Sequence, residues 1–417
     1  MGFGLDNLEE VNTGNHGSTK VDYLTLEFLY SILNWDHADP YSCDLNDIKK
    51  ISDQMSTNSD GRNPRAIYDE PRNVSIGPHH YGKPHLDRMQ VDKLRALRHF
   101  VKRGGLPVDS YLQALMKFVN PFRDSYGDPH GEIWQDNDRF VILMLLDGVF
   151  LLEFLSVTRG NQKYSDYAAT DPIFGHEGHV LIYEVIMQDL LMHTNQVPYL
   201  VLSTLLSVSE GLPEKSIQSI LSWMMFASKI EPGLHLLDMY LKGLLAEGQR
   251  AEKEDQPQED KNGRISISKL YHKYGVRCVR VQSYDNINFD KNTATLELPI
   301  IHINKQNAPK FVNLIIYERR EGNKNKDLNS YFDFMGSLIQ SPKDVNQLRC
   351  QGIIVNSSSS DEVVMELIKE ITKENVRGDK TCTTNLVRNE LNEFYKKGAT
   401  NIFRRCYAIL SSTLRMH

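Results

Sequence analysis

Two pairs of histidines are the residues in this sequence best suited to chemistry. His79 and His80 follow a Gly-Pro step, whereas His176 and His179 lie three positions apart. Imidazole binds zinc or acts as a general base, but a metal site needs three or four converging ligands with supporting hydrogen bonds. The spacing of His176 and His179 also differs from the H-E-x-x-H pattern, in which two helical rings face one ion. We therefore expect local hydrogen bonds for all four histidines and predict no metal ion or cofactor, with a metal-dependent enzyme as the alternative.

Ser75 opens the short stretch Ser-Ile-Gly-Pro that ends at Pro78, directly before the first histidine pair. A serine with a histidine base can act as a nucleophile in hydrolysis. However, the G-x-S-x-G elbow is missing from this stretch, and adjacency in sequence does not place an imidazole on a hydroxyl. Gly77 permits a positive φ and Pro78 fixes its own φ, so the stretch is interpreted as a rigid turn. A hydrolase that uses the histidine-rich loops stays open as the second function.

Asp147 is the most unusual charge in the chain, because it lies within the apolar stretch 140–157. A lone buried carboxylate is costly, so Asp147 must pair with a base or accept several hydrogen bonds. A catalytic acid is the other interpretation, but structural ion pairs also hold buried carboxylates. Gly148 beside it permits a close helix crossing. We predict a structural role for Asp147.

Asn195 and Gln196 precede Val197 and Pro198 in a second polar motif. Pro198 has no backbone N–H and must interrupt a helix that otherwise continues through this region. Amide side chains bind main-chain groups at such breaks. Asn195 and Gln196 are therefore predicted to cap the ends of the broken helix.

Composition restricts the classes of partner. The chain has 417 residues with 40% hydrophobic and 24% charged residues, as in ordinary globular proteins, and a net charge of -6. This acidic balance gives no broad positive field for a phosphate backbone, so we expect no nucleic-acid binding. The five cysteines include no C-x-x-C pair, which excludes a zinc ribbon and favours reduced thiols in the cytoplasm.

Membrane association is judged from two segments. Residues 140–157 are long and apolar but contain Asp147 and Glu153, which favours a buried core helix over a membrane span. Near the C-terminus, the apolar run Cys406 to Leu410 is much shorter than the roughly 20 residues that cross a bilayer. We expect a cytoplasmic chain that does not span a membrane, and peripheral attachment to a membrane stays open.

The residues just described must be positioned mostly by helices. Apolar spacing predicts helices at 21–35, 84–103, 111–122, 137–157, 180–209 with a break at Pro198, and 214–226. Gly104 and Gly105 are predicted to stop the second of these helices, and residues 136–138 to cap the fourth. Residues 246–264 carry many charges and almost no apolar side chain, which indicates a solvated linker.

Beyond the linker the pattern becomes mixed. Short β-rich runs at 276–282, 287–289 and 294–303 follow a helix at 265–274, and Pro299 indicates an edge strand or a bulge. Three further helices are predicted: one at 309–320, one that follows a capping box of Ser359 and Glu362, and one at 386–395. The prediction is a mostly α, α+β fold: a multi-helix globular domain with one small β-sheet in the C-terminal half. Its parts are a variable arm (1–61), a helical part (62–245), the linker (246–264) and an α+β part (265–417).

Three blocks occur in a fixed order: Ser75-Ile-Gly-Pro78 with His79 after it, Phe140 to Phe150 with its Leu-Asp-Gly, and Asn195-Gln-Val-Pro198. In this order they resemble a plant family catalogued as domain of unknown function 247, and the resemblance covers about residues 62 to 405. The family's usual acidic residues are replaced here by Gln90 and Thr194.

The resemblance implies a plant lineage and a function in recognition or signalling. Some grass members of the family are pollen-side determinants of self-incompatibility, and many members carry a membrane anchor. We therefore expect a non-enzymatic protein that acts through a protein partner. The resemblance also implies that nine residues form a structural family motif: Ser75, Gly77, Pro78, His79, Asp147, Gly148, Asn195, Gln196 and Pro198.

Overall fold

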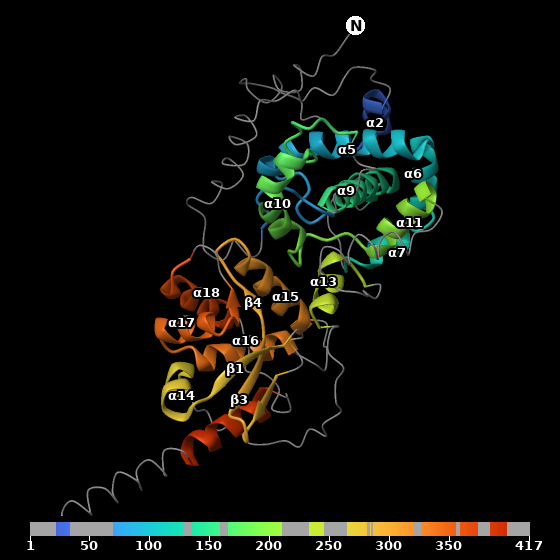
Figure 1. Cartoon of the computed structure of the whole chain (residues 1–417). Helices are drawn as coiled ribbons and strands as arrows, with labels where there is room; N and C mark the ends of the chain where they lie inside the picture. The colour runs from blue at the N-terminus through green and yellow to red at the C-terminus, as the bar shows by residue number, and fades with distance from the viewer. Residues whose placement is uncertain are drawn as a thin grey trace, which may run out of the picture. The chain divides into compact units, whose positions relative to one another are not determined.

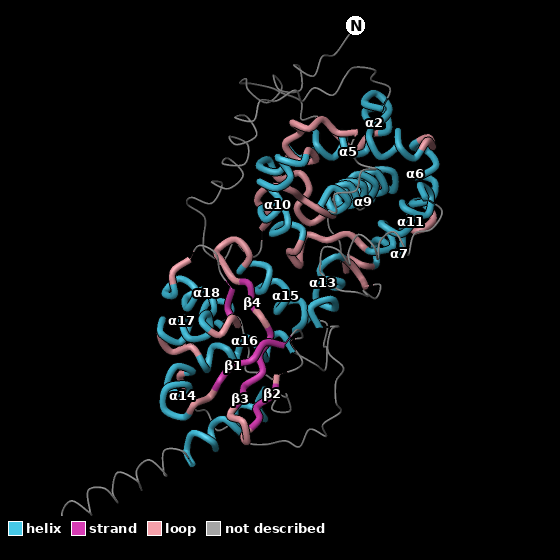
Figure 2. Tube along the Cα trace, in the orientation of Figure 1, coloured by secondary structure: helices cyan, strands magenta, loops and turns pink. Residues whose placement is uncertain are grey.

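The computed structural model describes residues 22–33, 70–127, 135–158, 166–210, 233–245, 265–281, 284, 287–320, 327–355, 359–373 and 384–397. The chain forms two compact units, residues 1–239 and residues 240–417. In the described part of the chain, every strand that forms a sheet belongs to the second unit, as the magenta segments of Figure 2 show. The predicted helix 214–226 and linker 246–264, and most of the arm 1–61, lie outside the described residues.

Unit 1 is a bundle of helices around one central helix. Figure 1 shows α9 viewed along its axis, with the other helices of the unit placed around it. The described helices of this unit are α2 (Leu26–Leu33), η1 (Pro84–Leu86), α5 (Arg88–Gly104), α6 (Val108–Met116), α7 (Val119–Asp124), α9 (Asn137–Thr158), α10 (His176–Leu190) and α11 (Tyr199–Glu210), and α13 (Leu236–Leu245) crosses the boundary between the units.

Helix α9 is apolar on all sides because it is covered on all sides. It packs against α5, α6, α10 and α11, and 94% of the most apolar 18 residues within Asn137–Val157 are buried inside the fold. Gly148 allows the contact with α11, since a Cβ at this position would lie 2.7 Å from Leu205 Cδ1 and 2.8 Å from Val201 Cγ1. Length and apolar composition would let this helix cross a membrane, but here it is the core of unit 1.

Two helix boundaries in unit 1 depend on single residues. Gly105 takes the left-handed conformation (φ 66°) that ends α5, where the Gly-Gly stop was predicted. The helix predicted at 111–122 is two helices, because α6 ends at Met116 and α7 starts at Val119. Pro121 explains the division, since a proline without an N–H fits the first turn of a helix but not its interior.

Unit 2 is an α+β arrangement built around two strands that follow each other along the chain. β3 (Thr295–Pro299) and β4 (Ile301–His302) follow each other along the chain. β1 (Arg277–Val281) lies parallel to β3, β5 (Ile354–Val355) lies parallel to β4, and β2 (Asn288–Asp290) is antiparallel to β3. Pro299, where an edge strand or a bulge was predicted, is the last residue of β3, which lies between β1 and β2 in one sheet, whereas β4 pairs with β5 in a second sheet.

The helices of unit 2 are α14 (Ile267–Tyr274), α15 (Ala308–Arg320), α16 (Asp327–Leu338), α17 (Pro342–Cys350), α18 (Asp361–Lys373) and a helix at 384–397. α16 and α17 were not predicted, although Ser341 and Asp344 form a capping box at the start of α17. The helix start predicted from a capping box at Ser359 lies one residue later, since Ser360 Oγ accepts the N–H of Val363 at 3.4 Å. The mostly α, α+β fold class is confirmed.

Candidate functional site

A segment without secondary structure, residues 72–77, runs through the interior of unit 1. Val74, Ser75 and Ile76 are at most 2% exposed. Backbone N–H and C=O groups that lose water must find other partners, and no neighbouring strand supplies them to this segment. Side chains from α5, α9, α10 and the α10–α11 loop supply them. Lys93, Asp147, Asp189 and Asn195 bind the segment itself, Gln196 holds the adjoining end of α10, and we call these five side chains the polar clamp.

Asp189, near the end of α10, holds the start of the segment. Its carboxylate accepts the N–H groups of Arg72 at 3.0 Å, Asn73 at 2.7 Å and Val74 at 3.0 Å. Burial raises the pKa of Asp189 to about 6, and the three N–H donors act in the opposite direction. A carboxylate in this place is therefore an acceptor for three main-chain donors at once.

Asn195 joins the segment to the end of α10. Its amide NH₂ donates to Val74 O at 3.0 Å and to Asp189 O at 2.9 Å, and its Oδ1 accepts Ile76 N–H at 2.6 Å. Gln196 donates to the carbonyls of Leu190 and Met192 at 2.7 and 2.8 Å. Both amides thus bind carbonyl groups at the C-terminal end of α10, which has no further helical turn to satisfy them.

Lys93 of α5 and Asp147 of α9 form an ion pair with both side chains fully buried. Asp147 Oδ2 also accepts the N–H of Gly77 at 2.7 Å, and Lys93 Nζ donates to Ser75 O at 2.6 Å. Burial raises the pKa of Asp147, and the Lys93 ammonium and the Gly77 N–H oppose that rise. We assign the pair as lysine ammonium and aspartate carboxylate, because each ion has its counter-ion and a main-chain partner.

Gly77 completes the passage of the segment through the core. Its φ is +76°, and a Cβ at this position would lie 2.4 Å from the backbone oxygen of Gln196. Tyr126 closes the same place, since its hydroxyl donates to Gln196 O at 3.1 Å. Pro78, also buried, follows, and the chain then returns to the surface at His79. Glycine is required both by the conformation and by the close approach of two backbones.

The clamp therefore unites most of the residues of the sequence motif. Ser75 is fully buried, and the partners of its hydroxyl are Lys93 Nζ at 3.5 Å and Gln90 Nε2 at 3.4 Å, so neither is a histidine. Pro198 lies after the clamp and forms an isolated β-bridge with His235. Charged and amide side chains thus hold the backbone of residues 72–77 in place.

The hydrogen bonds of the two buried histidines go to groups other than the clamp's ion pair. His80 is 7% exposed, and its Nε2 lies 2.9 Å from the hydroxyl of Thr194. His179 is 5% exposed and its Nδ1 lies 3.0 Å from Ile173 O. Burial lowers the pKa of each to about 4. His79 and His176 are exposed, and in the described part of the chain no three His, Cys, Asp or Glu side chains are grouped to hold a metal ion.

A second buried charge network was missed from the sequence. Glu153 of α9 is fully buried, pairs with both terminal nitrogens of Arg103 and accepts the hydroxyl of Tyr167 at 2.6 Å. Asp171 accepts the N–H groups of Ile173 and Phe174 and pairs with Arg95. The sequence signal for the Glu153 contacts was Glu153 itself, a second acid in the apolar stretch. Its partner Arg103 lies 50 positions away and Tyr167 lies 14 positions away.

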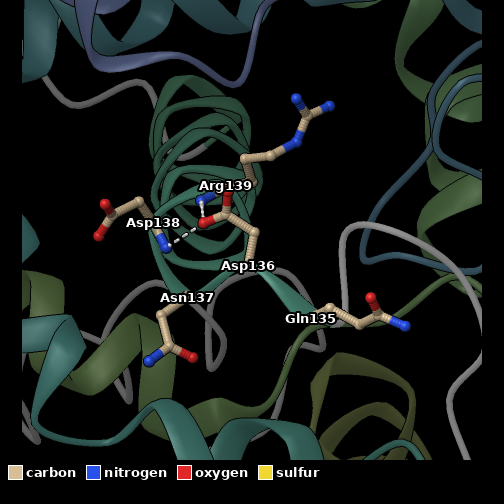
Figure 3. Close-up of a pocket in the computed structure, with 5 residues that line it drawn as sticks. All are labelled: Gln135, Asp136, Asn137, Asp138 and Arg139. Carbon is tan, nitrogen blue, oxygen red and sulfur yellow. Dashed lines mark hydrogen bonds between the residues drawn. The ribbon is translucent and has the colours of Figure 1, made fainter.

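A cavity of about 730 Å³ opens at the start of α9 and is lined by residues 135–139 (Figure 3). Asp136 caps the helix there, because its Oδ1 accepts the N–H groups of Asp138 at 2.9 Å and Arg139 at 3.2 Å. The cap thus lies at Asp136, within the predicted range of 136–138. Since a carboxylate already occupies the helix N-terminus, the cavity offers little to an anion.

Large apolar side chains are exposed on α10. Val180 is 65% exposed and Leu181 is 42% exposed, on the side of the helix opposite to buried Ile182 and Ile186. The solvent side of α10 thus carries these two apolar side chains beside the exposed His176, Glu177 and Glu184. Contiguous exposed apolar surface of this kind is typical of a contact with another protein.

Comparison with known proteins supplies a lineage. The model of the DUF247 family, described as "Plant protein of unknown function", matches residues 49–414. UPF0481 protein At3g47200 of Arabidopsis thaliana is 28% identical over 372 residues, which cover 80% of this chain and 75% of that protein. Putative UPF0481 protein At3g02645 of the same plant is 21% identical over 431 residues, with 78% of each chain covered. No solved structure matches the chain.

Proposed function

We propose that this chain, which belongs to the DUF247 family of plant proteins of unknown function, is a non-enzymatic recognition protein that acts by contact with another protein. The observation that carries the proposal is the polar clamp. Lys93, Asp147 and Asp189 are buried charges that bind the segment 72–77, and each holds the chain's own backbone. Groups used in this way make a rigid scaffold for surface loops and helix faces.

The outer surface supports the same proposal. Val180 and Leu181 leave an apolar strip on α10, which costs free energy in water unless a partner covers it. A partner that does so needs an apolar surface of its own with little charge at its centre. The specific role that the family resemblance suggests is that of a pollen-side determinant of self-incompatibility.

Segment exchange tests the role. Residues 1–61, with the segment 22–33 that packs on α5 left unchanged, or residues 246–264 are replaced by those of a relative from a different mating specificity, and pollen rejection is scored. We expect the specificity to follow these polar segments, because loops change partner choice without disturbing packing. An exchange of residues 74–100, which contain the clamped segment, is the matched control. If only the control exchange changes specificity, the assignment of recognition to the polar segments fails.

A second experiment tests the contact itself. Val180→Glu with Leu181→Glu places two charges on the exposed strip, and Val279→Glu, on a residue of unit 2 that is 47% exposed, is the control. We expect the first variant to fold normally and to lose pollen rejection, while the control keeps it. Full rejection with both glutamates present would remove α10 from the contact surface.

A further inference from the structure

The N-terminal helix α2 is docked on unit 1 as a separate piece. Thr25 caps it, since its hydroxyl accepts the N–H of Phe28 at 3.2 Å. Leu24 is 1% exposed and Leu29 is 0% exposed, so these two side chains are its anchors, and the helix packs on α5. The helix predicted at 21–35, within the variable arm, thus packs on the helical bundle of unit 1.

A polar contact fixes each end of the docked segment. Asp22 pairs with Arg139 at the start of α9, and the hydroxyl of Tyr30 donates to Asp109 in the first turn of α6. The segment 22–33 therefore lies across three helices, α5, α6 and α9, which we call the α2 site. These three helices also pack against one another, because α9 contacts both α5 and α6. The α2 site consequently consists of residues of α5, α6 and α9, which pack together without α2.

We propose that the α2 site takes the α2 helix of a second copy of this chain, so that two copies exchange these helices. Each contact of the exchanged form already exists within one chain, and exchange of an identical element gives a closed pair at low cost. Residues 34–69 connect α2 to the bundle. A chain of that length reaches at most about 120 Å, which is enough for α2 to cross to a neighbouring molecule.

The outer face of docked α2 favours the second copy as the occupant. Leu26 is 38% exposed and Tyr30 is 36% exposed on this face, so one chain alone leaves apolar surface in water. A second bundle that lies against the exchanged helix covers that surface. The tether works against exchange, since it holds α2 at an effective concentration on the order of millimolar near its own site. Exchange therefore increases with the local concentration of the chain.

The ion pair of Asp22 and Arg139 provides a test that separates the two arrangements. Asp22→Arg leaves two arginines facing each other within a chain, and Arg139→Asp leaves two aspartates. Neither variant can dock its own α2 without repulsion between like charges. In an exchanged pair of one copy of each, both contacts join opposite charges. The full chain with both substitutions, D22R/R139D, is the matched control, because it re-forms the pair within one molecule.

We expect each single variant to show the mass of one chain, 47.9 kDa, in native mass spectrometry, and their equimolar mixture to shift to twice that mass. Hydrogen exchange of residues 24–33 should be fast in each single variant and slow again in the mixture. A mixture that stays at the mass of one chain overturns the proposal, whatever the exchange rates are. That outcome would leave the proposed function unchanged, because α10 and the segment exchanges test it separately.

Discussion

Several buried residues of this protein are of the types that catalytic sites use, but their role is structural. A buried lysine, a buried aspartate and a serine hydroxyl lie together, which in an open cleft would suggest proton transfer. Here Lys93, Asp147 and Ser75 all have exposures of zero, and Lys93 and Asp147 hold the main chain of residues 75–77. Lys93 and Asp147 form hydrogen bonds with backbone groups that would otherwise be buried without partners.

Asp147→Asn tests whether the ion pair is structural. The asparagine can still accept the N–H of Gly77, but the Lys93 ammonium loses its counter-ion inside the core. The free energy of unfolding should fall by about 3 to 5 kcal/mol, measured by urea titration. Asp138→Asn, an exposed residue of the same helix, should change it by less than about 0.5 kcal/mol.

Adding Lys93→Met to Asp147→Asn removes the unpaired ammonium and should recover part of the lost stability. An Asp147→Asn protein with unchanged unfolding and lost pollen rejection would contradict the structural role and mark Asp147 as functional.

The stability of the fold should fall as the pH drops from 7 to 5. The folded-state pKa values of His80 and His179 lie at about 4, below the 6.5 of the unfolded chain. The unfolded chain therefore binds more protons in this range, which costs on the order of 1 to 2 kcal/mol for His179 by pH 5. Asp189 acts in the opposite direction, because its raised pKa of about 6 makes the folded state take up a proton.

The opposition gives a control. Asp189→Asn removes the stabilising proton uptake, so its melting temperature should fall more steeply from pH 7 to 5 than that of the wild type. His179→Gln should make the fall shallower. Parallel pH profiles for all three proteins would show that these buried groups do not set the pH dependence.

The sequence could predict what Asp147 needs but not which residue supplies it. An acid in an apolar helix demands a base, and that demand is visible in the printed residues. Lys93 lies 54 positions away, in a helix whose pattern gives no reason to expect a buried lysine. Asp189 was missed for a similar reason. Its three main-chain partners lie 115 to 117 positions earlier, and only the folded path of residues 72–74 brings them together.

At the level of elements, the turn at Gly77 and Pro78 redirects the chain and also forms a close backbone contact. It passes beside the α10–α11 loop so closely that two backbones are in contact, and Tyr126 closes the remaining space. Local signals predicted the turn, the αL stop at Gly105 and the long core helix. They failed for α16 and α17, whose sequences contain many polar residues, and for β5, which is two residues long and depends on its pairing with β4.

Gly77→Ala and Gly127→Ala form a matched pair that separates conformation from contact. Both glycines have positive φ, +76° and +78°, so alanine strains each backbone by about 1 to 2 kcal/mol. Of these two positions, only at Gly77 does the new Cβ meet a backbone oxygen, whereas at Gly127 no atom of the described residues lies within 4 Å of it. The loss of unfolding free energy should therefore be clearly larger for Gly77→Ala. Equal losses in urea titration would mean that the turn relaxes and that the contact is unimportant.

At the scale of the whole molecule, the family motif belongs to unit 1. The clamped segment, the central helix α9 and the cap of α10 are parts of one bundle, whereas unit 2 has its own core around the run from β3 to β4. The capping network of Asp344, which accepts from Ser266 and the N–H of Ser268, holds α14 to α17 without any clamp residue. The two units therefore rest on separate sets of buried polar contacts.

Hydrogen exchange can show whether the units also lose stability separately. Asp147→Asn removes a charge from the clamp, so amides of residues 74–77 and of α9 should exchange faster, because the opening of this region becomes cheaper. Amides of β1, β3 and α17 should keep their wild-type rates, since their partners all lie in unit 2. Asp344→Asn is the reciprocal control and should accelerate exchange at α14 and α17 alone. If either substitution accelerates exchange equally in both units, the chain opens as one cooperative body, and a defect in the clamp would then reach every surface that a partner could recognise.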